Sequence, residues 1–207
     1  MEKETKFMII FGIFIAALTI LNVVSVKIVT LFGLTFSVGA FIYAITFPCT
    51  DIISECWGKN RAKKVVLIGF LANILVVSFI LISISTPAAE FWEGNQAAFK
   101  TILGVVPRIL LASMIAYLIS QYHDVWAFHF WKNYTSGKYL WFRNNASTFT
   151  SQLIDSVIFV TIAFYGILPN SLLIPTIFGQ FVIKLGIAVI DTPFVYLLVN
   201  WIKNSTH

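Results

Sequence analysis

Six long apolar stretches dominate this sequence. They cover residues 7–27, 36–56, 65–84, 105–124, 147–168 and 176–199. An α-helix rises about 1.5 Å per residue, so about 20 residues cross the roughly 30 Å of hydrocarbon in a bilayer. Charged residues make up 11% of the chain, whereas a soluble domain typically has about 25%. The sequence therefore predicts an all-α, polytopic membrane protein in which residues 1–207 form a single domain with six transmembrane helices.

The basic residues predict the orientation of these spans. Three of them, Lys27, Lys100 and Arg108, would lie on one side of the membrane, and Lys184 lies within the last span. The remaining ten would lie on the other side: Lys3, Lys6, Lys59, Arg61, Lys63, Lys64, Lys132, Lys138, Arg143 and Lys203. Lysine and arginine accumulate in cytoplasmic loops. We therefore expect a multi-pass protein of the cell inner membrane with both termini in the cytoplasm. This scattered distribution also argues against nucleic-acid binding, despite a pI of about 9.3.

Several polar side chains lie inside or at the ends of the spans, where they are costly. An ionised residue at the centre of a span costs about 2.5–3.5 kcal/mol on insertion scales. At helical spacing these residues form one polar stripe in each of three spans. The stripes are Pro48, Asp51 and Glu55; Ser147, Ser151 and Asp155; and Gln180, Lys184 and Asp191. Three such stripes predict an internal polar cavity. The alternative, structural hydrogen bonds between helices, applies best to isolated amides such as Asn22, Asn73 and Gln180.

The charges of the stripes do not balance. The stripes contain four carboxylates (Asp51, Glu55, Asp155 and Asp191) but only one basic residue, Lys184. In a medium of low dielectric constant, such a surplus is relieved by protonation or by a cationic partner, and a substrate with N–H donors would also suit it. Asp191 lies two helical turns from Lys184, about 10 Å along the axis. We therefore expect Lys184 to pair with Asp155 or with a ligand.

The sequence has no nucleophile elbow, P-loop, dinucleotide fingerprint or HExxH metal pair. We expect neither a cofactor nor a metal ion, and we expect that the protein is not an enzyme. A membrane enzyme that uses Asp51 and Glu55 as an acid–base pair remains an alternative.

Three polar segments carry a resemblance to a known family. TDIISECWG at 50–58, RNNASTFTSQLID at 143–155 and KLGIAVIDTPFVY at 184–196 resemble the queuosine-precursor transporters, which are vitamin uptake transporters. The resemblance implies a six-span inner-membrane importer of 7-cyano-7-deazaguanine, 7-aminomethyl-7-deazaguanine or queuine. It implies a substrate-binding set of Asn22, Asp51, Glu55, Arg143, Asn145, Ser151, Gln152, Asp155, Lys184 and Asp191. Phe47, Phe149 and Phe194 are candidates for stacking on the flat base.

The mode of transport has two interpretations. The chain is either a secondary transporter or facilitator that works alone, or the substrate-binding subunit of an ATP-driven vitamin uptake system. The preferred base, coupling to protons and assembly into a homo-oligomer stay open. The acidic stripes of the second and fifth spans also suggest a 3+3 inverted repeat around a site at the membrane midplane.

The count of basic residues predicts the topology. Residues 59–64 and 132–143 should face the cytoplasm, and residues 85–104 should face the outside. Reporter fusions after Lys63 and Lys100 should therefore report opposite sides of the membrane. Reporting from the same side would refute this topology.

The spacing of Asp51 and Glu55 predicts different roles for the two acids. Carboxylates four residues apart on one helical face repel each other, so one stays ionised while the other binds a proton more readily. We expect Asp51, the deeper residue, to face the substrate, and Glu55 to hold the inner end of its span. Asp51→Asn should weaken substrate binding severely, whereas Glu55→Gln should lower transport or stability more than binding. Equal losses of binding would show that the two acids act as one site.

Overall fold

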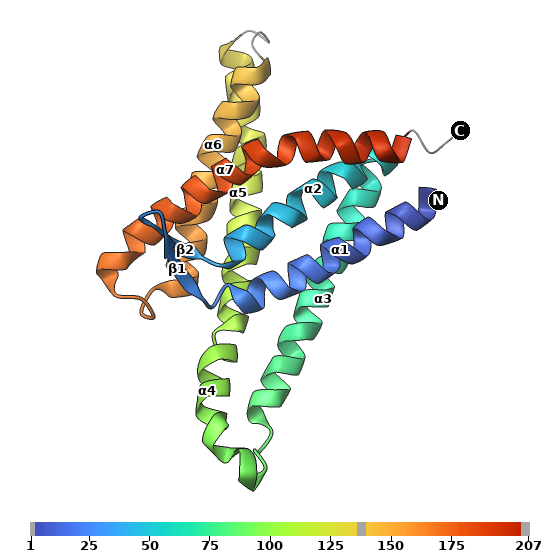
Figure 1. Cartoon of the computed structure of the whole chain (residues 1–207). Helices are drawn as coiled ribbons and strands as arrows, with labels where there is room; N and C mark the ends of the chain where they lie inside the picture. The colour runs from blue at the N-terminus through green and yellow to red at the C-terminus, as the bar shows by residue number, and fades with distance from the viewer. Residues whose placement is uncertain (1–2, 136–139, 204–207) are drawn as a thin grey trace. The chain divides into compact units, whose positions relative to one another are not determined.

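The structure is a computed structural model that describes residues 3–135 and 140–203, and it is mostly helical (Figure 1). Its α-helices are α1 Lys3–Val24, α2 Gly39–Trp57, α3 Lys59–Ser85, α4 Glu93–Leu103, α5 Val106–Tyr134, α6 Leu140–Phe164 and α7 Asn170–Lys203. A short 3-10 helix, Glu90–Trp92, precedes α4, and the strands β1 Ile28–Leu31 and β2 Leu34–Ser37 form a hairpin. Each of the six apolar stretches falls largely within one helix, so their helical assignment is confirmed.

Five helical segments of the described chain are long and apolar enough to cross a membrane. They are Lys3–Val24, Asn60–Ser85, Glu90–Ser120, Ala146–Phe164 and Asn170–Ile187. They include or overlap five of the six predicted spans. The exception is the second span, which coincides with α2 and contains Pro48 and the carboxylates Asp51 and Glu55. Six spans, cytoplasmic termini and an inverted repeat therefore stay predictions.

The chain divides into two compact units. The first contains α1 to α4 together with the part of α7 that begins at Gly186. The second contains Val29–Phe36 of the hairpin, α5 and α6, and the part of α7 that ends at Leu185.

The first unit packs α1, α2 and α3 around an apolar core. The core residues come from these helices and from the end of α7: Ile10, Phe14, Cys49, Ile52, Ile53, Val65, Val199 and Ile202. Gly69 of α3 lies so close to Phe14 and Leu18 of α1 that even a methyl group there would force those side chains to shift. Small residues allow membrane helices to approach in this way. Close packing thus holds α1 against α3.

Lys6 links α1 to the end of α7. Its side chain is buried, and its ammonium group donates a 2.8 Å hydrogen bond to the Trp201 carbonyl. The same ammonium lies 4.2 Å from the centroid of the Trp201 ring, at cation–π distance. The sequence indicated Lys6 only as one of the ten basic residues on the cytoplasmic side, because no pattern showed that it would contact the end of the chain.

The hairpin is an addition to the mostly helical chain that the sequence predicted. Its turn places Phe32 at φ 52° and Gly33 at φ 77°, both in the left-handed region that two-residue hairpin loops require. Hydroxyl groups of Thr30 and Thr35 lie 3.0 Å apart across the strands. The signal was present in the sequence IVTLFGLTFS, where β-branched residues flank a Phe-Gly turn. Neither the hairpin nor α4 was predicted, because both segments are too short to form a membrane span.

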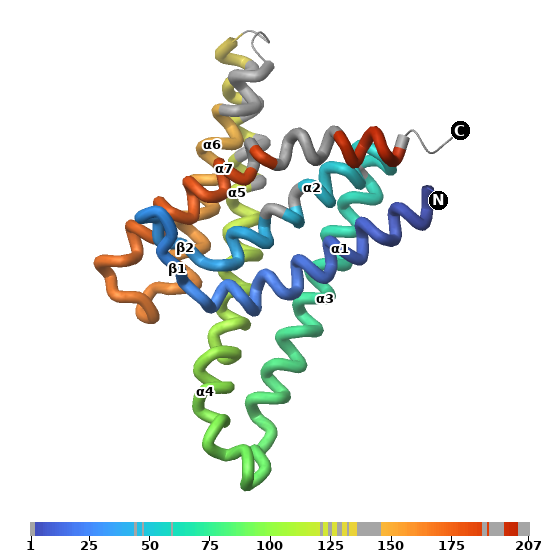
Figure 2. Tube along the Cα trace, viewed as in Figure 1, coloured from blue at the N-terminus to red at the C-terminus, as the bar shows by residue number. Residues whose placement is uncertain are grey.

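The hairpin packs closely on α7 within the second unit. A methyl group added at Gly179 would overlap the Thr35 carbonyl oxygen and approach the Thr35 backbone nitrogen. Figure 2 shows the hairpin, in blue, beside the first half of α7. Gly179 therefore permits the strand backbone to lie directly on the helix.

We predict that Gly179→Ala destabilises the protein by about 1–3 kcal/mol, because the hairpin must move away from α7. The measurement is thermal unfolding of the purified protein in detergent. Gly186→Ala is the matched control on the same helix, where an added methyl group meets nothing within 4 Å. It should leave stability unchanged or raise it slightly. Equal unfolding temperatures for the two variants would contradict the close contact.

Candidate functional site

The polar stripe of α6 and the described part of the stripe of α7 are buried in the second unit. Ser147, Ser151 and Asp155 are exposed by 1%, 5% and 7% respectively, and Gln180 and Lys184 by 4% and 5%. The helical spacing of these residues therefore identified inward-facing surfaces correctly. Whether the buried groups border a cavity that admits a ligand stays a prediction.

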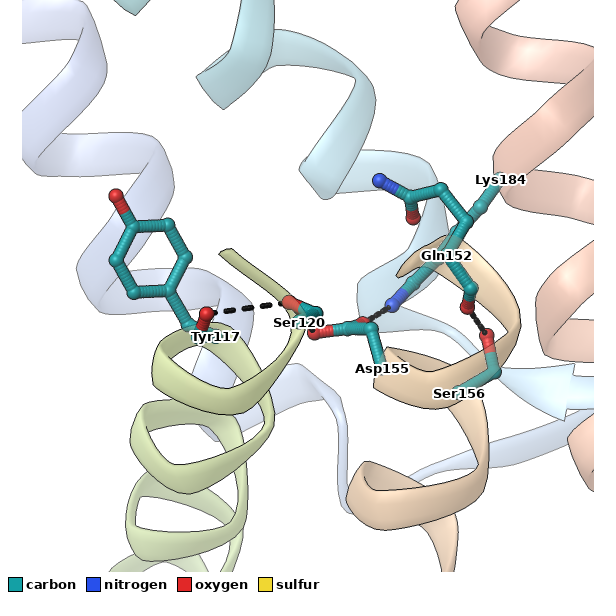
Figure 3. Close-up of polar contacts among 6 residues, drawn as sticks. All are labelled: Tyr117, Ser120, Gln152, Asp155, Ser156 and Lys184. Atoms are coloured by element: carbon teal, nitrogen blue, oxygen red, sulfur yellow. Dashed lines mark hydrogen bonds and ion pairs between the residues drawn. The ribbon is translucent and has the colours of Figure 1, made fainter. Parts of the chain in front are cut away.

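Asp155 and Lys184 form a buried ion pair at the centre of this cluster. The Lys184 ammonium contacts Asp155 Oδ2, and 4% of the lysine side chain and 10% of the aspartate side chain are exposed. Figure 3 shows the two side chains meeting between α6 and α7. Of the two partners expected for Lys184, Asp155 or a ligand, the structure shows Asp155.

Ser120 of α5 contacts the other oxygen of the same carboxylate. Its hydroxyl lies 3.5 Å from Asp155 Oδ1, and it also donates to the Tyr117 carbonyl at 3.1 Å (Figure 3). An O–H···O hydrogen bond is normally 2.5–3.0 Å long, so the contact with Asp155 is weak. Of the two carboxylate oxygens, Oδ1 is therefore the one that can more readily accept a further hydrogen bond.

A second contact joins α5 to the stripe on α6. His123 Nδ1 lies 3.1 Å from the Ser151 hydroxyl, and the tautomer of the imidazole decides which atom donates. Sequence reasoning missed Ser120 and His123 as members of the cluster. Their spacing of three residues on one helical face was the available signal.

Gln152 presents a buried acceptor beside this cluster. Its side-chain Oε1 is buried and has no hydrogen-bond partner among the described residues. Its backbone carbonyl accepts a 2.9 Å hydrogen bond from the Ser156 hydroxyl (Figure 3). Buried polar groups in proteins are almost always hydrogen-bonded, so an unpaired amide oxygen at this position suggests that a ligand supplies a donor.

Arg108 fixes the end of the helix that carries Asp155. Its Nε donates to the Ile162 carbonyl at 2.6 Å, and its NH2 nitrogen donates to the Tyr165 carbonyl at 2.6 Å. The last carbonyls of a helix lack partners within the helix, and a cation there is favourable. Arg108 was predicted only as one of the few basic residues on the outer side. The structure shows that it ties the start of α5 to the end of α6.

Of the three candidates for stacking on the base, Phe149 has a described side chain, and it lies in the second unit. The Phe149 ring packs edge to face on Phe181, with the ring centroids 4.9 Å apart and an interplanar angle of 84°. The other two stacking candidates, Phe47 and Phe194, lie outside the described side chains.

The first unit contains four of the predicted site residues, and three of them, Asn22, Asp51 and Glu55, have described side chains. Asn22 Nδ2 donates to Asn73 Oδ1 at 3.0 Å, a buried bond between α1 and α3, which is the structural alternative considered for these amides. Asn22 Oδ1 is itself buried without a partner. Asp51 and Glu55 are exposed on α2. The side chains of Arg143, Asn145 and Asp191 lie outside the described residues.

Comparison with known proteins identifies the family. Residues 37–198 match the family described as "Putative vitamin uptake transporter". The chain is 34% identical over 187 residues to a "Probable queuosine precursor transporter" of Bacillus subtilis (strain 168), which covers 89% of this chain and 80% of that protein. It is 27% identical over 137 residues to a "Queuosine precursor transporter" of Escherichia coli (strain K12), covering 66% of this chain and 59% of that protein. No solved structure matches the chain.

The relatives are named as transporters, which agrees with the prediction that the protein is not an enzyme. Several helices of the described chain are long and apolar enough to cross a bilayer. The chain therefore is a multi-pass membrane protein and belongs to the vitamin uptake transporter family.

Proposed function

We propose that the protein imports queuosine precursors across the inner membrane and that the polar cluster of α5, α6 and α7 binds the base. The names of the relatives support a transporter of this class. The observation that carries the proposal is the buried Asp155–Lys184 pair. Ionisable residues inside membrane helices are costly and commonly mark the path of a substrate or ion.

The chemistry of the pair suits the lactam edge of a guanine-type base. An ammonium group beside a carboxylate offers a donor next to an acceptor. A lactam offers the complementary order, a carbonyl acceptor next to an N–H donor. Lys184 would donate to the ring carbonyl while Asp155 accepts from the ring N–H. The three candidate bases (7-cyano-7-deazaguanine, its aminomethyl analogue and queuine) share this edge.

The net charge of the pair also bears on the substrate. Lys184 and Asp155 together carry no net charge, so the described part of the cluster does not require a charged ligand. A neutral heterocycle can therefore bind without leaving a buried charge uncompensated. Two further carboxylates of the predicted set, Asp51 and Glu55, are exposed on α2 and are candidates for a proton-coupled step.

Variants of the ion pair separate its structural and functional roles. Asp155→Asn or Lys184→Met alone leaves one buried charge without its partner, which should destabilise the protein by about 3–5 kcal/mol. The double variant Asp155→Leu/Lys184→Met removes both charges and should regain much of the lost stability. We predict that none of the three accumulates 7-cyano-7-deazaguanine in reconstituted liposomes.

The double variant provides the decisive outcome. If it is stable and transports the base at the wild-type rate, then the pair is structural and the binding site lies elsewhere. Thermal unfolding in detergent supplies the stability measurement for each variant.

Reconstitution of the wild-type protein also tests the mode of transport. A transporter or facilitator that works alone should take up the base without any other protein. Uptake that requires an added ATP-driven module would favour the substrate-binding-subunit interpretation.

A further inference from the structure

Gln152 has an unusual position for an amide in a membrane helix. Among the described side chains, three buried polar atoms have no hydrogen-bond partner, namely Asn22 Oδ1, Trp57 Nε1 and Gln152 Oε1. Of these, Gln152 Oε1 belongs to the helix that carries Asp155. A buried acceptor without a donor costs about 1–3 kcal/mol. Gln152 Oε1 therefore destabilises the fold until a ligand donates a hydrogen bond to it.

The position of Gln152 places this acceptor next to the ion pair. Gln152 and Asp155 are three residues apart on α6, which makes them neighbours on the helix surface. Figure 3 shows the Gln152 side chain leaving α6 on the side from which Lys184 approaches. The cluster therefore presents, in one region, a cationic donor and two acceptors of different charge.

We propose that Gln152 is a specificity-determining residue that accepts a hydrogen bond from the exocyclic amine of the base. This inference rests on the proposed function and extends it. Lys184 donates to the ring carbonyl, Asp155 Oδ1 accepts from the ring N–H in place of its weak contact with Ser120, and Gln152 Oε1 accepts from the adjacent amino group. A guanine-type edge has this order of one acceptor and two donors, whereas a hypoxanthine-type edge lacks the second donor.

The energetics make this contact selective. A ligand without the amine would bury Gln152 Oε1 and leave it unpaired, and sites built to hydrogen-bond a substrate N–H reject analogues that lack it. A ligand with the amine satisfies an acceptor that is unpaired in the ligand-free fold. The site should thus prefer aminated lactams over otherwise identical lactams.

The test compares two ligands on four proteins. The ligands are 7-cyano-7-deazaguanine and the same base without its exocyclic amine, and affinity is measured by titration calorimetry in detergent. The proteins are the wild type, Gln152→Met, Gln152→Glu and the control Gln96→Met, whose Gln96 lies on α4 and donates to the Ile84 carbonyl. The wild type and Gln96→Met should prefer the aminated base by about tenfold or more.

The two Gln152 variants should respond differently. Gln152→Met removes the acceptor, so affinity for the aminated base should fall about tenfold while affinity for the other base stays the same or rises. Gln152→Glu keeps an acceptor and should retain the preference. If Gln152→Met is too unstable to purify, then the preferences of the wild type and of Gln152→Glu still decide the matter.

The outcomes distinguish this inference from the proposed function. Binding of both bases by the wild type with equal affinity, or equal losses for both in Gln152→Met, would overturn the role of Gln152 and leave the proposed function intact. A wild type that binds neither base would overturn both.

Discussion

The neutralisation of Asp155 by Lys184 is the interaction on which the arrangement of α5, α6 and α7 depends. Neither charge could stay in an apolar helix bundle alone, because the desolvation of each ion costs several kcal/mol. Their contact requires the polar stripes of α6 and α7 to face each other, which buries Ser151 and Gln180 with them. Ser120 and His123 then bring α5 to the same cluster. The ion pair therefore orients three helices at once, whatever ligand binds there.

Pairing of backbone groups is the second constraint, because a bilayer offers no water to unpaired N–H and C=O groups. The hairpin pairs its own strands, and the missing side chain of Gly179 allows it to lie on α7. Arg108 supplies donors to the carbonyls at the end of α6. These contacts hold the end of α6 and one face of α7, the two helices that carry Asp155 and Lys184.

Sequence patterns predicted the helices and the inward faces of α6 and α7 because hydrophobic length and helical period are local properties. The same spacing on α2 did not predict burial, since Asp51 and Glu55 are exposed. Sequence patterns also limited the partner of Lys184 to Asp155 or a ligand, because a buried ammonium needs a compensating group and Asp191 is too far along its own helix. Patterns could not predict that Lys6 reaches Trp201 or that Thr35 touches Gly179, since these contacts join distant segments. The resemblance to the queuosine-precursor transporters placed both Ser151 and Gln152 in the predicted set. It gave no sign that the Ser151 hydroxyl has a partner and Gln152 Oε1 has none.

The same energetics constrain how a base can occupy the cluster. A ligand that separated Lys184 from Asp155 would have to compensate both charges, because breaking one partner away from a buried pair costs about 3–5 kcal/mol. A neutral lactam cannot do so with a single carbonyl and a single N–H. It can, however, add its hydrogen bonds to a pair that stays intact, using the weakly engaged Oδ1 of Asp155. The favourable pose therefore lies beside the ion pair, and the same helix carries the unpaired oxygen of Gln152 three residues before Asp155.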